Sequence, residues 1–255
     1  MNVSRRLLLR RTGAFALGAF LTALAAACGA SPTTNESPLP GAERNGSQEK
    51  ADMDNRLPPG QHVVNRLPIL DLGIRPDVSL DEWSLDIGGH VENPVRLTWV
   101  EFQNLPHVEK VWDWHCVTGW SKFDVRVGGV PFGEIVKLVR PRDGTTSVIF
   151  ESRDGYTSNT PYQEMLDKES LLADQLDGQA LPLEHGGPMR GFIPWLYAWK
   201  SAKFLSGIRF QTQDESGYWE TRGYHNHADP WNEERFGGFS IFGRSRRGGV
   251  TPPLL

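Results

Sequence analysis

The sequence predicts a single strand-rich α+β domain, and three observations lead to this class. The chain of 255 residues contains 27 glycines, 18 prolines and nine tryptophans, which indicates many turns between short strands. Leucine-patterned runs of the kind that build helical bundles are few. The body of the chain (55–255) is roughly 200 residues long, the size of one domain, and shows no internal repeat.

The first half of this body predicts short strands around one helix. An extended lead-in (66–70) precedes a strand in which apolar and polar residues alternate (82–91). Thr98 and Glu101 have the spacing of a capping box, which predicts that a short helix begins near Thr98. The next strand runs into a loop within 108–119, so Cys116 is predicted to lie at a strand end.

The second half predicts one clear helix and a closing strand. A tight turn and an apolar-faced helix are expected within 127–141, and Pro141 ends that helix. There follow a strand and turn (146–159), helical patches (161–178), a Gly/Pro loop with a broken apolar segment and the closing strand (184–213), and a polar, aromatic loop (217–236).

The N-terminus predicts an exported protein. The motif "SRRLLLR" (4–10) resembles a twin-arginine signal, and the uncharged stretch after it is shorter than the roughly 20 residues that span a bilayer. Small residues before Cys28 resemble a lipoprotein cleavage site; the alternative is an ordinary signal peptide cut at an Ala-x-Ala site. We expect a signal peptide (1–27), a lipidated Cys28 and a flexible tether (28–54).

These features predict an extracytoplasmic protein that a lipid anchors to the cell membrane, or alternatively a soluble secreted or periplasmic protein. The mild formal net charge of −4 gives no indication of nucleic-acid binding. With Cys28 lipidated, Cys116 has no partner in the chain, although a free thiol is a liability in an oxidising compartment.

Three interpretations of Cys116 are open. It is a buried core thiol, a nucleophile with a distant histidine as base, or the ligand of a metal whose other ligands come from a cofactor. The histidine spacing fits no zinc pattern.

Four blocks of sequence favour the third interpretation. They are "HCVTGWS" (115–121), "GVPFGEIVKLVRP" (129–141), "EHGGPMRGFIPWLYAWKSAKF" (184–204) and "YWETRGYHNHADPWNEERF" (218–236). Their order and spacing resemble the molybdopterin-dependent sulfite oxidase family, in particular its small bacterial branch with the catalytic molybdopterin domain only. The resemblance covers roughly 55–236 and implies a sulfite-oxidase-type molybdopterin-binding fold.

The resemblance also implies an enzyme with a molybdenum–molybdopterin cofactor. It would catalyse two-electron oxygen-atom transfer with a small-molecule oxo donor or acceptor. In the family a cysteine thiolate ligates molybdenum, and Cys116 stands at that position. Tyr224 stands at the position of the substrate-site tyrosine. The implied cofactor-binding residues are Asn65, Arg66, Cys116, Ser152, His185, Arg190, Ser201, Ala202 and Lys203.

The chemistry of these residues suits an anion, because Arg190 can bind a phosphate through two parallel hydrogen bonds and Lys203 adds a point charge. Two departures leave the substrate open. Val64 stands where true sulfite oxidases have a sulfite-binding arginine, and His185 stands where the methionine sulfoxide reductase branch has asparagine.

We predict that electrons pass between this protein and a separate redox partner. The sequence has no Cys-x-x-Cys-His haem site and too few cysteines for an iron–sulfur cluster, so we expect no haem. An external partner is implied, either a cytochrome or a membrane redox protein, and we expect a monomer. The rival hypothesis is a non-enzymatic, membrane-anchored lipoprotein, a binding module in which Cys116 is a buried core thiol.

Overall fold

The computed structural model describes residues 53–237. The predicted signal peptide, Cys28 and nearly all of the predicted tether lie outside the described residues, so the expected boundaries of these segments stay predictions. Within 53–237 the chain forms two β-sheets with a few short helices, which confirms the strand-rich α+β class.

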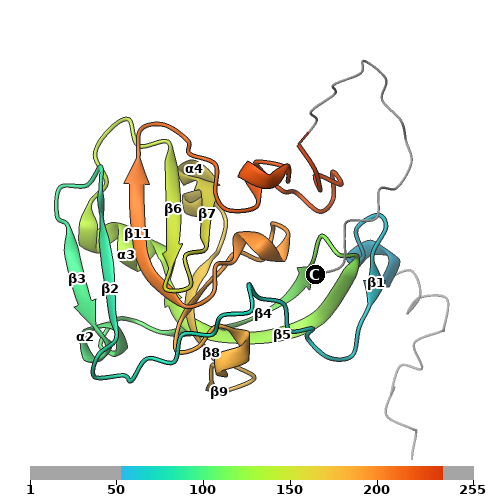
Figure 1. The fold of residues 1–255 in the computed structure, drawn as a ribbon, viewed down its shortest axis with the longest axis horizontal. Coiled ribbons are helices and arrows are strands. Elements are labelled where there is room, and N and C mark those ends of the chain that lie inside the picture. The colour runs from blue at the N-terminus through green and yellow to red at the C-terminus, as the bar shows by residue number, and fades with distance from the viewer. Residues whose placement is uncertain (1–52, 238–255) are drawn as a thin grey trace, which may run out of the picture. The chain divides into compact units, whose positions relative to one another are not determined.

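The first sheet carries the part of the molecule that holds Cys116. A long antiparallel pair, β4 (Val108–His115) and β5 (Trp120–Pro131), dominates it and is prominent in Figure 1. Its other strands are β1 (His62–Val63), β8 (Leu171–Leu176), β9 (Gln179–Ala180) and β10 (Arg190–Phe192). The path β1-β5-β8-β10 places the start of the body and the Arg190 segment in the same sheet as Cys116.

The second sheet has the order β3-β2-β11-β6-β7, and Figure 1 shows these strands side by side. Its members are β2 (Ser84–Gly89), β3 (Val95–Thr98), β6 (Ser147–Ser152), β7 (Thr157–Pro161) and β11 (Leu205–Gln211). β11 is the predicted closing strand, and it pairs in parallel with β2 and antiparallel with β6. It follows directly on the segment that contains Lys203, so the sheet fixes one end of that segment.

The helices follow local sequence signals. Helix α2 (Trp99–Gln103) has the predicted capping box between Thr98 and Glu101, and α3 (Phe132–Val139) ends at Arg140, just before Pro141. The remaining helical segments are α4 (Tyr162–Asp167) and the 3₁₀ turns η1 (Leu183–His185), η2 (Ala198–Lys200) and η3 (Glu220–Arg222). The α-helices pack residues such as Phe102, Ile135 and Met165 into the main core with the second sheet.

Two predicted elements are wrong. The expected tight turn at the start of 127–141 is the end of strand β5, and the second half of the expected helical region 161–178 is strand β8. The two errors share one cause. A Cβ atom on Gly129 would overlap the carbonyl oxygen of Leu172, so the glycine allows β8 to pair closely with β5.

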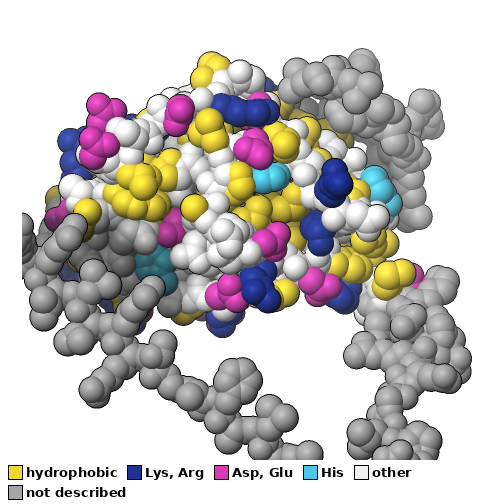
Figure 2. Space-filling model, turned by 90° about the horizontal axis from the view of Figure 1, so that it is seen from below, with side chains coloured by type: hydrophobic (Ala, Val, Ile, Leu, Met, Phe, Trp, Pro, Cys, Tyr) yellow, Lys and Arg dark blue, Asp and Glu magenta, His cyan; other side chains and the backbone are white. Residues whose placement is uncertain are grey.

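The surface carries charges of both signs. On the face shown in Figure 2, positive and negative side chains are interspersed among hydrophobic ones, as the mild net charge leads one to expect. Within residues 53–237, no helix is long and apolar enough to cross a membrane.

Candidate functional site

Cys116 lies in a tight turn between β4 and β5. Its backbone N–H donates to the carbonyl of Trp120, and its own carbonyl accepts from the N–H of Gly119 and from the side chain of Gln61. Gly119 has a φ of 96°, in the left-handed region that favours glycine. The turn therefore holds Cys116 firmly, and the residue is only 5% exposed.

The surroundings of the thiol are apolar but contain unused polar atoms. Burial raises the pKa of Cys116, while the Thr118 hydroxyl, 3.3 Å from the sulfur, and the Arg235 guanidinium act in the opposite direction. The indole N–H groups of Trp114 and Trp120 are buried without a hydrogen-bond partner. Buried polar groups are normally satisfied, so these orphans fit a bound polar group.

Arg190 is a buried cation without a counter-charge. It lies in β10, 5% exposed, and donates to the carbonyls of His185 at 2.7 Å, Ser201 at 2.6 Å and Gly191 at 3.3 Å. It forms no ion pair with any carboxylate of residues 53–237, and burial lowers its pKa to about 9. Burying an unpaired charge is unfavourable, so this site favours an anionic occupant.

A second cation lies beside it. Lys203 donates to the carbonyl of Glu184 at 2.6 Å, and burial together with the charge of Arg190 lowers its pKa to about 8. Burial and the same two cations lower the pKa of His185. Gly186, at φ 105°, allows the close approach of His185 and Lys203, because a Cβ atom at position 186 would overlap the Lys203 side chain. Gly186 thus lets the His185 loop and the Lys203 segment pack together.

A small cavity lies between Arg190 and the end of β4 that precedes Cys116. Its wall includes Leu67, Trp114, His185, Arg190 and Phe192. Trp114 lies two positions before Cys116, and both belong to one apolar cluster with Phe192. Of the four sequence blocks, 184–204 therefore lines this cavity, and 115–121 begins directly after Trp114 of its wall.

The other predicted cofactor-binding residues differ in their burial and in their hydrogen bonds. The hydroxyl of Ser201 accepts from the N–H of Ile193 at 2.9 Å, and Ala202 is buried in the core, so in this structure both shape the Arg190 segment. The Ser152 hydroxyl is buried without a partner. Asn65 and Arg66 are exposed, next to Leu67. Their contact with a cofactor stays a prediction.

Tyr224 is placed on the cysteine side. Its ring packs against Trp199, Trp219 and Phe236, with ring centroids 4.9 to 5.3 Å apart. Burial raises the pKa of its hydroxyl, and the nearby Cys116 adds to this effect. The structure therefore brings Tyr224 and Cys116 together although 108 positions separate them in the sequence.

Three neighbours of Cys116 were not predicted from the sequence. Gln61 donates to its carbonyl, Tyr197 places its hydroxyl nearby, and Arg235 donates to the carbonyl of Val117 at 2.6 Å. Tyr197 and Arg235 fall inside two of the recognised sequence blocks, but no local pattern distinguishes them there. They come from segments that only the fold brings to the turn.

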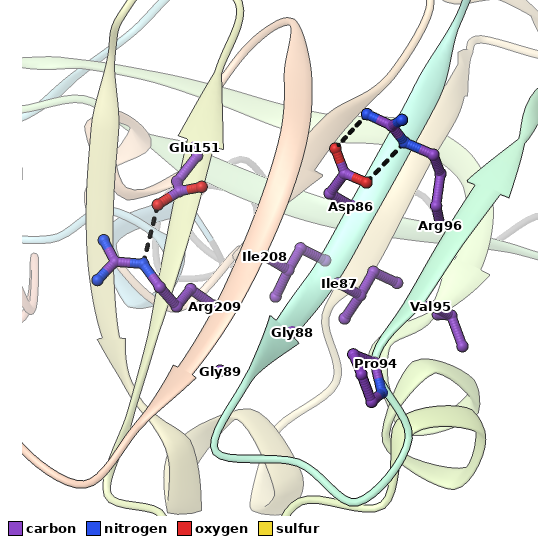
Figure 3. A pocket seen from close by; sticks show the side chains of 10 residues that line it. All are labelled: Asp86, Ile87, Gly88, Gly89, Pro94, Val95, Arg96, Glu151, Ile208 and Arg209. Atoms are coloured by element: carbon purple, nitrogen blue, oxygen red, sulfur yellow. Dashed lines mark hydrogen bonds and ion pairs between the residues drawn. The ribbon is translucent and has the colours of Figure 1, made fainter.

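A larger groove of about 410 Å³ lies elsewhere, on strands β2, β3, β6 and β11 of the second sheet (Figure 3). Its charges are compensated, because Arg96 pairs with Asp86 and Arg209 pairs with Glu151. It contains none of the predicted site residues, so its size alone does not make it the catalytic site.

Comparison with known proteins defines the class of protein. Residues 72–219 match the family described as "Oxidoreductase molybdopterin binding domain". The oxidoreductase YuiH of Bacillus subtilis is 38% identical over 192 residues, which are 75% of this chain and 97% of YuiH. The chain belongs to this molybdopterin-binding oxidoreductase family and is an enzyme, which confirms the predicted resemblance and removes the support for a non-enzymatic binding module.

Two further similarities are partial. The catalytic subunit MsrP of the protein-methionine-sulfoxide reductase of Xanthomonas axonopodis is 34% identical over 149 residues, 52% of this chain and 46% of MsrP, so the chain spans about half of that relative. The sulfane dehydrogenase SoxCD of Paracoccus pantotrophus has a similar fold, with a TM-score of 0.51 over 55% of this chain and 40% of the SoxCD chain, at 18% identity.

The residues present fit the cofactor that the family implies. Arg190, a buried cation without an ion pair among residues 53–237, lines a small cavity with His185 and Trp114, and the buried Cys116 thiol lies in one apolar cluster with Trp114. Lys203 adds a second positive charge, and the indole N–H groups of Trp114 and Trp120 have no hydrogen-bond partner. A thiolate suits molybdenum as a soft ligand, and the cations suit the phosphate of molybdopterin. Cys116 would hold the metal, and Arg190, Lys203 and His185 the phosphate-bearing end.

Proposed function

We propose that this protein is an exported molybdenum enzyme that catalyses two-electron oxygen-atom transfer at a metal held by Cys116, with an external redox partner. The observation that carries the proposal is the pairing of a buried thiol with an uncompensated buried guanidinium on the two sides of Trp114. The cofactor, once bound, would supply the redox chemistry, and the chain supplies binding, orientation and electrostatics.

The chain's residues divide into two groups of roles. Arg190 and Lys203 hold the anionic end of the cofactor, because Arg190 is a buried cation without a carboxylate partner among residues 53–237 and Lys203 is a partly buried cation beside it. Tyr224 and Tyr197 lie on the Cys116 side, where a phenol hydroxyl can hydrogen-bond the transferred oxygen of a substrate. Buried aromatic rings around them exclude bulk water.

Electron balance requires a partner. Oxidation of sulfite consumes water and yields sulfate, two protons and two electrons, whereas reduction of a sulfoxide consumes two electrons and two protons and yields a sulfide and water. The sequence offers no haem or iron–sulfur motif to store these electrons. We therefore propose exchange with a cytochrome or a membrane redox protein.

Export and anchoring form the second part of the proposal. The twin-arginine-like motif supports transport in a folded state, which a cofactor inserted in the cytoplasm requires. Cys28 would carry the lipid that anchors the enzyme at the outer face of the cell membrane. Mass spectrometry of the membrane fraction tests this: a lipid-modified Cys28 at the N-terminus is expected, and an unmodified N-terminus downstream of Cys28 contradicts it.

The enzymatic part is tested on the protein purified from a host that makes molybdopterin. We expect molybdenum and pterin in the protein, with either sulfite-dependent reduction of ferricyanide or sulfoxide-dependent oxidation of reduced benzyl viologen. A protein that carries no molybdenum from such a host contradicts the proposal.

A further inference from the structure

Lys200 is a buried lysine that the proposed function does not use. Its side chain is fully buried, and the ammonium contacts Oε1 of Glu220 at 2.5 Å, the carbonyl of Asn226 at 2.6 Å, and Oδ1 and the carbonyl of Asn159 at 2.7 and 3.0 Å. An ammonium has three N–H donors and no acceptor, so these oxygens suit the charged form. The side chain of Glu220 is also buried, at 1% exposed.

The carboxylate of Glu220 binds a second donor next to Lys200. Its Oε1 atom also accepts from the indole N–H of Trp199 at 2.9 Å. The Trp199 ring in turn packs nearly perpendicular to the Tyr224 ring, with centroids 5.1 Å apart. Glu220 therefore fixes the orientation of the indole against which Tyr224 lies.

Tyr224 is tied to the ion pair on both sides along the chain. Glu220 begins the 3₁₀ turn η3, and the N–H of Gly223, which directly precedes Tyr224, donates to the carbonyl of Glu220 at 3.1 Å. Two positions after Tyr224, the carbonyl of Asn226 accepts from Lys200. Lys200 and Glu220 thus hold the loop before and after Tyr224.

Lys200 also belongs to the segment on the cofactor side of the site. It directly precedes Ser201, whose carbonyl accepts from Arg190. The carbonyl of Lys200 itself accepts from the Ser158 hydroxyl of β7 at 3.2 Å. The ion pair therefore joins the segment that is proposed to bind the cofactor to the loop that carries Tyr224.

Stability alone does not explain this pair. Two charges lose their hydration on burial, and replacement of a buried ion pair by uncharged residues of similar volume is often neutral or stabilising. The exposed pair of Glu134 and Lys137 in α3 avoids that cost. A buried pair that lies one turn before a substrate-site residue suits a role in geometry.

We propose that Lys200 and Glu220 are positioning residues that orient the Tyr224 hydroxyl toward substrate beside the Cys116 turn. This inference rests on the proposed function, in which Tyr224 acts on substrate, and it adds two residues to that function. Lys200 and Glu220 act through Tyr224 and not by contact with substrate. The competing interpretation is that the pair only stabilises the fold.

A pair variant removes both charges at once. Lys200→Met/Glu220→Gln keeps the side-chain lengths and leaves an oxygen for the indole of Trp199. The matched control is Glu134→Gln/Lys137→Met, which removes an exposed pair of the same two residue types. All proteins are prepared full-length and loaded with molybdenum in the same host, and thermal unfolding and metal content are measured first.

The surroundings of Tyr224 are followed by ¹⁹F nuclear magnetic resonance. The chain has five tyrosines, and 3-fluorotyrosine in their place gives resonances that Tyr224→Phe and Tyr162→Phe assign. We expect the Tyr224 resonance to shift or broaden in the pair variant. The resonance of Tyr162, whose ring packs against Phe210, should stay unchanged, and the control pair should alter neither resonance.

A double-mutant cycle then tests whether the pair acts through Tyr224. Turnover is measured with sulfite and ferricyanide or with dimethyl sulfoxide and reduced benzyl viologen, whichever the wild type supports. We expect the pair variant to keep its molybdenum and to lower the turnover number at least about tenfold. In that background, Tyr224→Phe should lower it further by less than about threefold, because residues that act as a unit are not additive. The control pair should stay within about twofold of wild type.

Four results overturn the inference. They are an unchanged Tyr224 resonance in the pair variant, a turnover number within about threefold of wild type, equal costs of Tyr224→Phe in both backgrounds, and a folded pair variant that loses its molybdenum. If the pair variant does not fold, Glu220→Gln alone, which keeps the contact of Lys200 with Asn226, is judged by the same four results.

Failure of the proposed function looks different. A wild type without molybdenum, or a Tyr224→Phe protein with the turnover of wild type, contradicts the proposed function, and the inference falls with it. Equal costs of Tyr224→Phe in both backgrounds, with a loaded and active wild type, overturn the inference alone.

Discussion

The guanidinium carbon of Arg190 lies 4.6 Å from the centroid of the Trp114 ring, and Trp114 precedes Cys116 by two positions. This contact joins the two ends of the candidate site. A cation over an indole face is attracted by the ring, by about 2 kcal/mol or more when the pair is desolvated. The contact fixes β10 against the end of β4, so the anion-binding residues and the thiol keep a constant relationship.

Loss of the Arg190 charge should empty the site of its cofactor. We expect Arg190→Gln to lower pterin content at least about tenfold, since hydrogen bonds to a charged group contribute about 1.5–3 kcal/mol each. Pterin released by acid and iodine oxidation is measured by fluorescence. Arg209→Gln, in the compensated surface groove, is the control and should keep full pterin content.

Because Arg190 also binds three carbonyls, the stability of the Arg190→Gln apoprotein must be compared with that of the wild-type apoprotein. An apoprotein of Arg190→Gln that unfolds near the wild-type temperature, yet retains full pterin after loading, would contradict the assigned role.

Lys203 gives the apoprotein a specific pH dependence. Its pKa is about 8 in the folded state and near 10.5 in the unfolded state, so above pH 8 the unfolded chain binds more protons. The penalty of the buried charge is therefore full below pH 8 and is relieved as the pH rises from about 8 to 10.5. The free energy of unfolding of Lys203→Met should lack this rise, relative to wild type.

The measurement is urea unfolding of both apoproteins at several pH values in that window. Lys137→Met, at an exposed lysine of α3, is the control and should follow the wild-type curve. In the loaded protein the bound phosphate should restore the charged state of Lys203, and the rise should shrink. Parallel curves for wild type and Lys203→Met would rule out the desolvated lysine.

Tyr224 should affect turnover and not loading. Tyr224→Phe removes a hydroxyl near Cys116 but keeps the ring that packs against Trp199 and Trp219. We expect full molybdenum content and a turnover number lower by about 10- to 1,000-fold, the upper value applying where charge develops on the transferred oxygen. Tyr218→Phe, in the same loop, is the control.

Steady-state rates and metal content decide this prediction together. A Tyr224→Phe protein that loses its metal, or one with the turnover of wild type, would show that the hydroxyl does not act on substrate.

Local sequence signals predicted part of the fold and site. The Thr98–Glu101 capping box and the helix before Pro141 depend on neighbours within a few residues, so the pattern alone locates them. Strand β8 could not be found in this way, because its apolar start also suits a helix and its pairing with β5 depends on Gly129. The sequence pattern instead predicted that Gly129 belongs to a turn.

The residues of the candidate site also fall into two groups, those that the sequence predicted and those that only the fold brings to the site. Cys116, His185 and Arg190 stand in sequence blocks that resemble a known family, and that resemblance implied their roles. No role was predicted for Arg235, because it contacts Val117 across 118 positions, and a lone arginine in a polar loop resembles a solvated charge. Only the packed structure shows its contact with the Cys116 turn.

The central claim is that Cys116 binds molybdenum, and metal analysis of Cys116→Ala tests it most directly. Wild type and Cys116→Ala are loaded in the same host, checked for equal thermal stability as apoproteins, and analysed by mass spectrometry for molybdenum per chain. The account predicts about one molybdenum per chain in wild type and, in the variant, either a lower molybdenum content or an altered electron paramagnetic resonance spectrum of the metal that the cofactor retains, because the thiolate of Cys116 is lost. Equal molybdenum in both proteins, with an unchanged electron paramagnetic resonance spectrum of the metal, would contradict it.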